Sequence, residues 1–357
     1  MASIYPEQVA QLPEVDELFK RIGWQVDQLM SIDTRGKGII PPLYAAARDL
    51  MGSPLAMTAA RRLREAINPG DVVGIITGFP SRSFLGRGIT ETDGPVGAVF
   101  LARVLEEVLN AVPVFIIDPE LQRYLRRASW TAGLLITDLD TALVAKRGPV
   151  NASAVAFYDC SVNDTEAQAA AEHFVNAYAP AALIAVEMPS IAADGFAHTA
   201  GGRAIVHEHL PKAHHFWYAA QAREVLCVGL GDGGNEMGLG NIAPVLKELY
   251  SVGDLIAAAT SSDVPVVGAS SNWAAYAIGV CIEAHEGTTH RVRDIDLPGI
   301  IHRCAEEGAI DGFSVRPEAK VDGTPVLLNT AVLDLMTWVV DRAILEAGKG
   351  WLKSDWR

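Results

Sequence analysis

The sequence predicts an α/β fold with a mostly parallel central sheet flanked by helices, and with its active site on the loops at the strand ends. Short, continuously apolar runs alternate with Ala-rich helical segments such as 165–178. Such runs are typical of strands buried on both faces of a parallel sheet. The chain has 357 residues, 50% of them hydrophobic, which is enough for a sizeable core. The predicted strands cover residues 72–76, 112–117, 134–136, 155–157, 182–186, 225–229 and 264–268.

The N-terminal part of the chain is predicted to be helical. Acidic and apolar positions alternate at helical spacing over residues 5–30, and residues 43–67 predict two helices separated at Gly52-Ser53-Pro54. A further helix is expected over residues 97–110. No linker or repeat divides the sequence. We therefore expect one α/β domain over residues 1–357, in which residues 1–70 form a mainly helical cap.

Composition and charge exclude several classes of function. The formal net charge of −14 argues against nucleic acid as a partner, because phosphate binding needs clustered Lys and Arg. No apolar run reaches the roughly 18 residues that span a bilayer, and the N-terminus lacks the pattern of a signal peptide. We therefore expect a cytoplasmic protein with no membrane partner. Four widely separated cysteines predict reduced core thiols: Cys160, Cys227, Cys281 and Cys304.

An acidic glycine-rich loop, Gly231–Gly240, follows the strand predicted at 225–229. Residues 229–234 match the dinucleotide pattern G-x-G-x-x-G. Asp232 and Glu236 would nevertheless place two negative charges where a pyrophosphate should lie, so no NAD is expected. Oxygen-bearing side chains are the ligands that Mg²⁺ and Mn²⁺ prefer. The loop predicts a site for such a cation, and a nucleotide-binding sensor protein is the alternative outside the enzymes.

A second acidic loop follows the strand predicted at 72–76. Glu91 and Asp93 stand two positions apart beside Gly94-Pro95, after Thr77 has ended the strand. Two carboxylates at this spacing can point toward one place, as metal ligands or as an acid and a base. The alternative is that Asp93 caps the helix that follows.

Polar residues also follow other predicted strands. Glu187 comes directly after residues 182–186, and Asn272 lies just beyond residues 264–268. Two late Asp-Gly pairs, at Asp311 and Asp322, are each a turn signal when taken alone. Together with the two acidic loops, these residues predict one acidic pocket at the strand ends.

Five histidines crowd between residues 198 and 215, which suggests a metal site or a general base. Their spacing does not form the His-Glu-x-x-His motif, so histidines at the surface or behind the site are the alternative. These residues are His198, His207, His209, His214 and His215.

The chain resembles the D-glutamate cyclase-like family over roughly residues 28–340. The motifs that carry the resemblance occur in the family's order and approximate spacing: Thr77-Gly78-Phe79, Glu91-Thr92-Asp93-Gly94-Pro95, the Gly231–Gly240 loop, Ser271-Asn272-Trp273 and Gly308-Ala309-Ile310-Asp311-Gly312. The resemblance implies an α/β fold with a divalent metal, Mn²⁺ or Mg²⁺, in an acidic cavity. It also implies a hydro-lyase activity, the intramolecular dehydration of D-glutamate to 5-oxo-D-proline.

These expectations assign roles to particular side chains. Metal ligands are expected among Asp232, Glu236, Asp93 and Glu91. Catalytic carboxylates are expected among Glu91, Asp93, Glu187 and Asp311. Substrate-binding groups are expected at Asn235, Asn272, Gly233, Gly234 and Thr77. The expected partner is a small glutamate-like or cyclic amide substrate, and the sequence is compatible with a homo-oligomer.

One segment departs from the family pattern. Where many members have Glu-Arg-Pro-Gly, this chain has Glu187-Met188-Pro189-Ser190. Met188 cannot clamp a substrate carboxylate as a bidentate arginine would. Replacement cations are available at Arg35, Arg82, Arg87 and Arg203. The departure motivates an alternative enzyme, a hydrolase that opens the ring of a hydantoin, lactam or cyclic imide.

Overall fold

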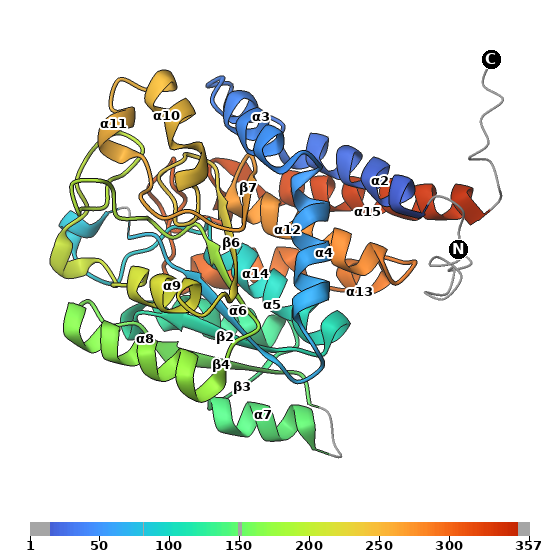
Figure 1. Cartoon of the computed structure of the whole chain (residues 1–357), viewed down its shortest axis with the longest axis horizontal. Coiled ribbons are helices and arrows are strands. Elements are labelled where there is room, and N and C mark those ends of the chain that lie inside the picture. The colour runs from blue at the N-terminus through green and yellow to red at the C-terminus, as the bar shows by residue number, and fades with distance from the viewer. Residues whose placement is uncertain (1–14, 81, 149–151, 349–357) are drawn as a thin grey trace.

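The computed structural model describes residues 15–80, 82–148 and 152–348. Within these ranges, seven strands form one sheet in the order β3-β4-β2-β1-β5-β6-β7 (Figure 1). Every pair of neighbouring strands in this sheet is parallel, which confirms the predicted α/β fold. The strands are β1 (Val72–Thr77), β2 (Val112–Ile117), β3 (Leu135–Thr137), β4 (Ala154–Asp159), β5 (Ala182–Val186), β6 (Leu226–Gly231) and β7 (Val264–Val267).

Each strand predicted from the sequence coincides with an observed one to within two residues at either end. The continuous apolar runs identify the strands because helices cover both faces of the sheet. Accordingly β1, β2, β5, β6 and β7 are buried along their whole length.

The strand order reverses at β1. From β1 the chain builds the sheet outward on one side through β2, and it later returns to the other side of β1 with β5, β6 and β7. Such a reversal opens a crevice at the carboxyl ends of the strands, where ligands bind in open α/β sheets. The loops after β1, β5 and β6 therefore meet at this position.

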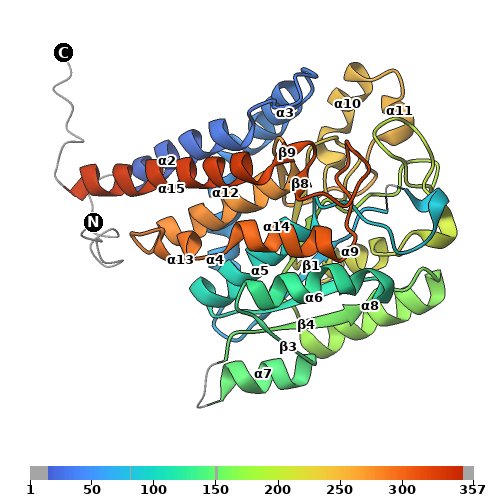
Figure 2. The ribbon, with the colours of Figure 1, turned by 180° about the vertical axis from the view of Figure 1, so that it is seen from behind.

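Helices form a layer on each face of the sheet, as the views from opposite sides show (Figures 1 and 2). One core joins the sheet to α4 (Leu55–Ala66), α5 and α12, with α2 (Val15–Met30), α14 and α15 packed outside them. A second core lies under α7, α8 and α9. These helices are α5 (Pro95–Leu109), α7 (Leu139–Arg147), α8 (Asp164–Tyr178), α9 (His214–Gln221), α12 (Ser271–Ala284), α14 (Leu297–Glu306) and α15 (Val326–Gly348).

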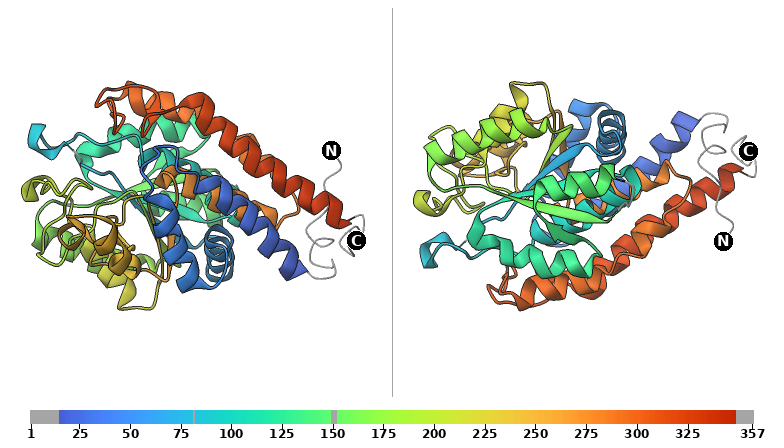
Figure 3. Two further views of the ribbon diagram at one scale, coloured as in Figure 1. Left: turned by 90° about the horizontal axis from the view of Figure 1, so that it is seen from above. Right: turned by 90° about the horizontal axis from the view of Figure 1, so that it is seen from below.

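The N-terminal segment is helical, as predicted. It contains α2 (Val15–Met30), α3 (Ile40–Met51) and α4 (Leu55–Ala66); residues 5–14 of the helix expected over 5–30 lie outside the described part. The expected break between α3 and α4 occurs at Gly52, whose φ of 66° ends α3 in the left-handed conformation. Helices α2 and α4 pack against α12, and α2 also runs along α15 (Figure 3).

Shorter elements complete the described chain. They are α6 (Gln122–Thr131), α10 (Ala243–Leu249), α11 (Gly253–Ile256), α13 (His290–Arg293), the antiparallel pair β8 (Lys320–Val321) and β9 (Thr324–Pro325), and the 3₁₀ turns η1 (Ser83–Leu85), η2 (Pro119–Leu121), η3 (His207–His209) and η4 (Gly240–Ile242). Among the described helices, none combines the length and the apolar character that a membrane crossing requires. All four cysteines are free and buried, as predicted.

Candidate active site

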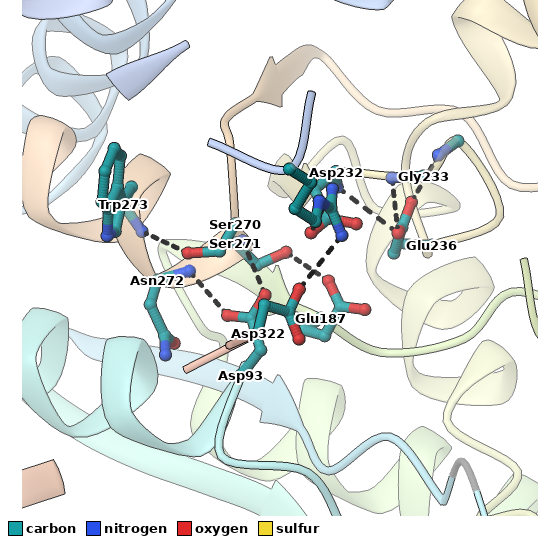
Figure 4. A network of polar contacts seen from close by, with 12 residues as sticks. Asp93, Glu187, Asp232, Gly233, Glu236, Ser270, Ser271, Asn272, Trp273 and Asp322 are labelled. Atoms are coloured by element: carbon teal, nitrogen blue, oxygen red, sulfur yellow. Dashed lines mark hydrogen bonds and ion pairs between the residues drawn. The ribbon is translucent and has the colours of Figure 1, made fainter. Parts of the chain in front are cut away.

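A polar cavity of about 320 Å³ lies at the carboxyl ends of β1, β5 and β6. Segments distant in sequence contribute to its wall, from Arg35 near the N-terminus to Asp322 near the C-terminus. Five carboxylates line it: Glu91, Glu187, Asp232, Glu236 and Asp322. Figure 4 shows several of these side chains converging, together with that of Asp93.

The Gly231–Gly240 loop is folded around the carboxylate of its own Glu236. Oε1 of Glu236 accepts the backbone N–H groups of Gly233 at 2.8 Å and Asp232 at 3.3 Å, and Oε2 accepts that of Gly234 at 2.7 Å (Figure 4). Glycine is required at Gly231 because a Cβ there would lie 2.5 Å from Glu236 Oε2. The loop's density of glycines thus follows from its tight wrapping around a buried carboxylate.

This wrapping decides what the loop can bind. In dinucleotide-binding loops, backbone N–H groups of this kind hold phosphate oxygens. Here Glu236 already occupies them, so a phosphate would have to displace a buried carboxylate. Burial and the charge of Asp232 raise the pKa of Glu236 to about 7. The arrangement favours a cation rather than an anion beside the loop.

Asp93 and Asn272 join the N-termini of two neighbouring helices by capping each other's helix. Asp93, just before α5, accepts the backbone N–H groups of Ser271 at 3.1 Å and Asn272 at 2.9 Å in the first turn of α12. Asn272 Oδ1 accepts those of Gly94 at 3.0 Å and Gly97 at 2.7 Å in the first turn of α5. Both side chains are fully buried. Asp93 therefore caps α12, and it also accepts the N–H group of Gly94, at the start of the helix that it precedes, at 3.0 Å.

Glu187 follows β5 directly and turns sharply there, with a φ of 47°. A left-handed conformation is uncommon for a residue other than glycine and often marks a functional position. Its Oε2 accepts a hydrogen bond of 2.6 Å from Ser271 Oγ (Figure 4). Burial and the neighbouring charges of Glu236 and Asp232 raise the pKa of Glu187 well above its usual range.

Asp232 stands at the centre of the cavity, paired with Arg35. Asp232 Oδ2 lies 3.0 Å from Arg35 Nη2, yet it receives no well-directed hydrogen bond. Arg35 Nη1 also contacts Asp322 Oδ2 at 3.2 Å. Burial favours the neutral form of Arg35, but the charges of Asp232 and Asp322 outweigh this effect and raise the pKa of its guanidinium.

The carboxylates form two groups whose oxygens could hold a cation, and Asp232 belongs to both. Within each group, one oxygen from each residue lies within 4.8 Å of the others. The first group is Asp93, Asp232 and Asp322, and the second is Glu187, Asp232 and Glu236. Burial and mutual repulsion raise the pKa values of Asp93 and Asp322 as well. An oxygen-only donor set whose buried charge Arg35 compensates only in part fits a hard divalent cation such as Mg²⁺ or Mn²⁺.

Other expected site residues lie in or near the cavity with different surroundings. Glu91 lines the cavity but belongs to neither group of possible ligands found among the described residues. Asn235 lines it too, and its Nδ2 donates to the carbonyl of His198 at 2.9 Å. Thr77 Oγ1, at the end of β1, is buried and has no hydrogen-bond partner among the described residues. Gly233 and Gly234 present their N–H groups to Glu236.

Two expected residues have side chains fully engaged by the backbone. Asp311 accepts N–H groups from Ser314 at 2.7 Å and Gly323 at 2.6 Å, so it holds together the loop that carries Asp322. Asn272, besides accepting two N–H groups, donates to the carbonyl of Thr92 at 3.1 Å. The contacts of both side chains are those of groups that position the site.

The four arginines expected as replacement cations differ in whether they line the cavity. Arg35 and Arg82 line the cavity, as does Lys37. Arg87 instead makes a bidentate pair with Asp118, and Arg203 lies over the ring of Phe84. Met188 is buried in the core under α7, α8 and α9.

Asp322 and Arg35 are the residues whose importance the sequence conveyed least. Asp322 appeared there only as part of an Asp-Gly turn signal, and Arg35 only as one of several spare cations. Each becomes notable through its partner: Asp322 through the carboxylate group that it completes, and Arg35 through the two aspartates that it contacts. A φ of 48° at Asp322 gives it the same conformation as Glu187.

Comparisons with known proteins identify relatives of this chain. The model of a family described as D-glutamate cyclase-like, C-terminal, matches residues 26–337. The human mitochondrial D-glutamate cyclase is 29% identical over 261 residues, which make up 72% of this chain and 38% of the human protein. The chain therefore spans less than half the length of that relative.

Proposed function

Because the chain belongs to the D-glutamate cyclase-like family, we propose that it is a metal-dependent lyase. Its proposed reaction closes glutamate, or a close analogue, to a 5-oxoproline-type lactam with loss of water. D-Glutamate is the first substrate to test, since the human relative is named for it. The cavity of about 320 Å³ lies at the lower end of the range for small-molecule sites.

The observation that carries the proposal is the shared position of Asp232 in two groups of buried carboxylates. Burying this many carboxylates together is unfavourable unless cations compensate them. Arg35 supplies one positive charge, and a divalent cation would supply more. Asp93, Asp232, Glu236 and Asp322 are the residues that would hold it.

A divalent cation in this cavity would polarise the side-chain carboxyl of the substrate and stabilise the oxyanion that forms when the amine attacks. Positive side chains on the cavity wall, Arg35, Lys37 and Arg82, are placed to bind the substrate's other carboxylate. Held in this way, the substrate would bring its own nitrogen close to the carbon it attacks.

Proton transfer is assigned to Glu187. The ammonium nitrogen must lose two protons while a carbon–nitrogen bond forms, and the departing oxygen must gain both to leave as water. Glu187 lines the cavity, and Ser271 holds its Oε2. Burial and the charges of Glu236 and Asp232 raise its pKa, which favours a carboxyl that both accepts a proton from nitrogen and returns one to oxygen.

The proposal is tested by incubating the protein with D-glutamate and Mn²⁺ and measuring 5-oxoproline by chromatography. Asp232→Asn should lower the rate by about 100-fold or more, which corresponds to a few kcal/mol of lost transition-state stabilisation. Bound metal, measured by elemental analysis, should fall in the same variant. Asp254→Asn is the matched control, since the Asp254 side chain is 87% exposed on α11.

Full activity and full metal content in Asp232→Asn would show that this assignment is wrong. The same preparations should be offered cyclic amides, including 5-oxoproline and hydantoin. Ring opening without ring closure would mean that the protein is a cyclic amide hydrolase and not a lyase. Both reactions can be catalysed by one set of carboxylates.

A further inference from the structure

A second cluster of metal-binding side chain types lies apart from the carboxylate cavity, at the start of α8 and α9. It contains Asp164, the first residue of α8, and His214 and His215, the first two residues of α9. One ligand atom from each of these three residues lies within 4.8 Å of the others. His207, in η3, points its Nε2 at the same carboxylate from 3.8 Å.

The backbone brings these residues together independently of any ion. Helices α8 and α9 pack side by side on one face of the sheet. The N–H group of Lys212, just before α9, donates to the carbonyl of Ser161, just before α8, at 2.9 Å. The two helices therefore begin next to each other, and their first side chains face the same space.

The spacing of the ligand atoms suits a tetrahedral ion. Asp164 Oδ1 lies 3.1 Å from His215 Nε2 and 3.8 Å from His214 Nε2. Metal–ligand bonds of about 2.0–2.1 Å in a tetrahedron place ligand atoms roughly 3.3 Å apart. The two distances lie on either side of this value, and the ligand atoms of His214 and His215 lie within 4.8 Å of each other. His207 or water would be the fourth ligand.

The chemistry of the three side chains selects the class of metal. Imidazole nitrogens with one carboxylate suit Zn²⁺ and its transition-metal neighbours, whereas the oxygen-only cavity suits Mg²⁺ or Mn²⁺. Lys212 opposes a cation here, because its charge also acts on Asp164 and His214.

We propose that Asp164, His214 and His215 form a binding site for a Zn²⁺-class ion that joins α8 to α9. The site is separate from the proposed catalytic cavity and does not depend on the proposed reaction. It would strengthen the base of α9, whose Trp217 packs close to Gly238 in the Gly231–Gly240 loop and donates to the carbonyl of Ser261 at 2.9 Å.

The test is calorimetric titration of the full chain with Zn²⁺ alone. It uses the Asp232→Asn variant, in which metal binding by the carboxylate cavity should be weaker. We expect one Zn²⁺ site, whose affinity falls at least about 100-fold in His215→Ala or Asp164→Asn. Loss of a residue that only hydrogen-bonds to a metal ligand already lowers metal affinity 10–100-fold. Zn²⁺ should also raise the melting temperature, and this rise should disappear in His215→Ala. His302→Ala is the matched control, because His302 is an exposed histidine on α14.

Co²⁺ provides a second readout that does not depend on affinity. In a tetrahedral site with imidazole ligands it absorbs visible light strongly, and His215→Ala should remove that absorption while His302→Ala keeps it. The proposal is overturned if no Zn²⁺ binds in the Asp232→Asn background, or if His215→Ala and Asp164→Asn bind it as tightly as their parent. Mn²⁺-dependent ring closure should survive His215→Ala in an otherwise unchanged chain, so failure of this proposal and failure of the lyase proposal are distinguishable.

Discussion

At the scale of single residues, the most informative side chain is Glu236. It combines three backbone hydrogen bonds, which favour the charged carboxylate, with complete burial beside Asp232, which favours the neutral acid. Burial and repulsion prevail, and the pKa rises. Near neutral pH, Glu236 can therefore lose its proton, or exchange it for a cation, with a small change in conditions.

This balance predicts how stability depends on pH when a chelator keeps the cavity free of metal. The pKa of Glu236 is 4.5 in a model peptide and about 7 in the folded protein. The folded state therefore keeps a proton that the unfolded chain has lost. The resulting stabilisation, on the order of 3 kcal/mol, is complete below the lower value and is lost as pH rises through the higher one.

Urea unfolding at pH 5 and pH 8 measures the effect. The free energy of unfolding should fall more between these two pH values in the parent protein than in Glu236→Gln, which cannot ionise there. Asp93, Glu187 and Asp322 shift in the same direction and remain in both proteins. Glu248→Gln, on the exposed side of α10, should behave like the parent. If the free energy of unfolding fell equally in Glu236→Gln and in the parent, the raised pKa of Glu236 would be contradicted.

At the scale of elements, the site depends on how α5 and α12 begin. These helices pack closely together, and each donates its first N–H groups to a side chain from the other's N-terminal end. Helix N-termini leave such donors without intrahelical partners. The exchange fixes Asp93 between the two helices and so sets the position of one possible metal ligand.

Asn272→Ala should disrupt this exchange. It would leave the N–H group of Gly97 buried without a partner, at a cost of about 2 kcal/mol. The N–H group of Gly94 and the carbonyl of Thr92 would each lose one of two partners, because Gly94 also donates to Asp93 and Thr92 also accepts from Val96. Denaturant unfolding measures the loss. Asn176→Ala removes an exposed hydrogen bond to Arg223 and should change stability by less than about 0.5 kcal/mol. Equal effects of the two substitutions would show that the capping exchange does not stabilise the fold.

At the scale of the whole molecule, the cavity ties together segments from both ends of the described chain. Arg35 precedes α3, whereas Asp322 lies in the turn between β8 and β9. Between them, the loops after β1, β5 and β6 bring their carboxylates to the place where the strand order reverses. A ligand at this position contacts groups that separate completely when the chain unfolds, so its binding is linked to global stability.

Mn²⁺ should therefore raise the melting temperature of the whole protein. At a concentration about 100 times the dissociation constant, the stabilisation is about 2.7 kcal/mol, and we expect a rise of roughly 4 °C. Differential scanning calorimetry, with the chelator-treated protein as reference, measures this shift. Asp232→Asn should lose most of it and Asp254→Asn should keep it. An unchanged shift in Asp232→Asn would place the cation elsewhere.

The sequence alone determined the strands and the acidic character of their end loops. Residues 72–76 and 182–186 were identifiable because strands buried on both faces must be apolar throughout. The Gly231–Gly240 loop was identifiable because tight backbone wrapping requires glycine, and its charges argued for a cation. Both signals depend only on residues that are adjacent in the sequence.

Only the tertiary structure decided which distant side chains are partners. It pairs Arg35 with both Asp232 and Asp322. It also turns Asn272 and Asp311 toward the backbone and places Asp164 beside His214. The contacts of Arg35, Asn272 and Asp164 have no signal in the spacing of residues along the chain, because each joins segments that are far apart in the sequence. A carboxylate's role depends on its burial and on its neighbours' charges, and both are properties of the folded molecule.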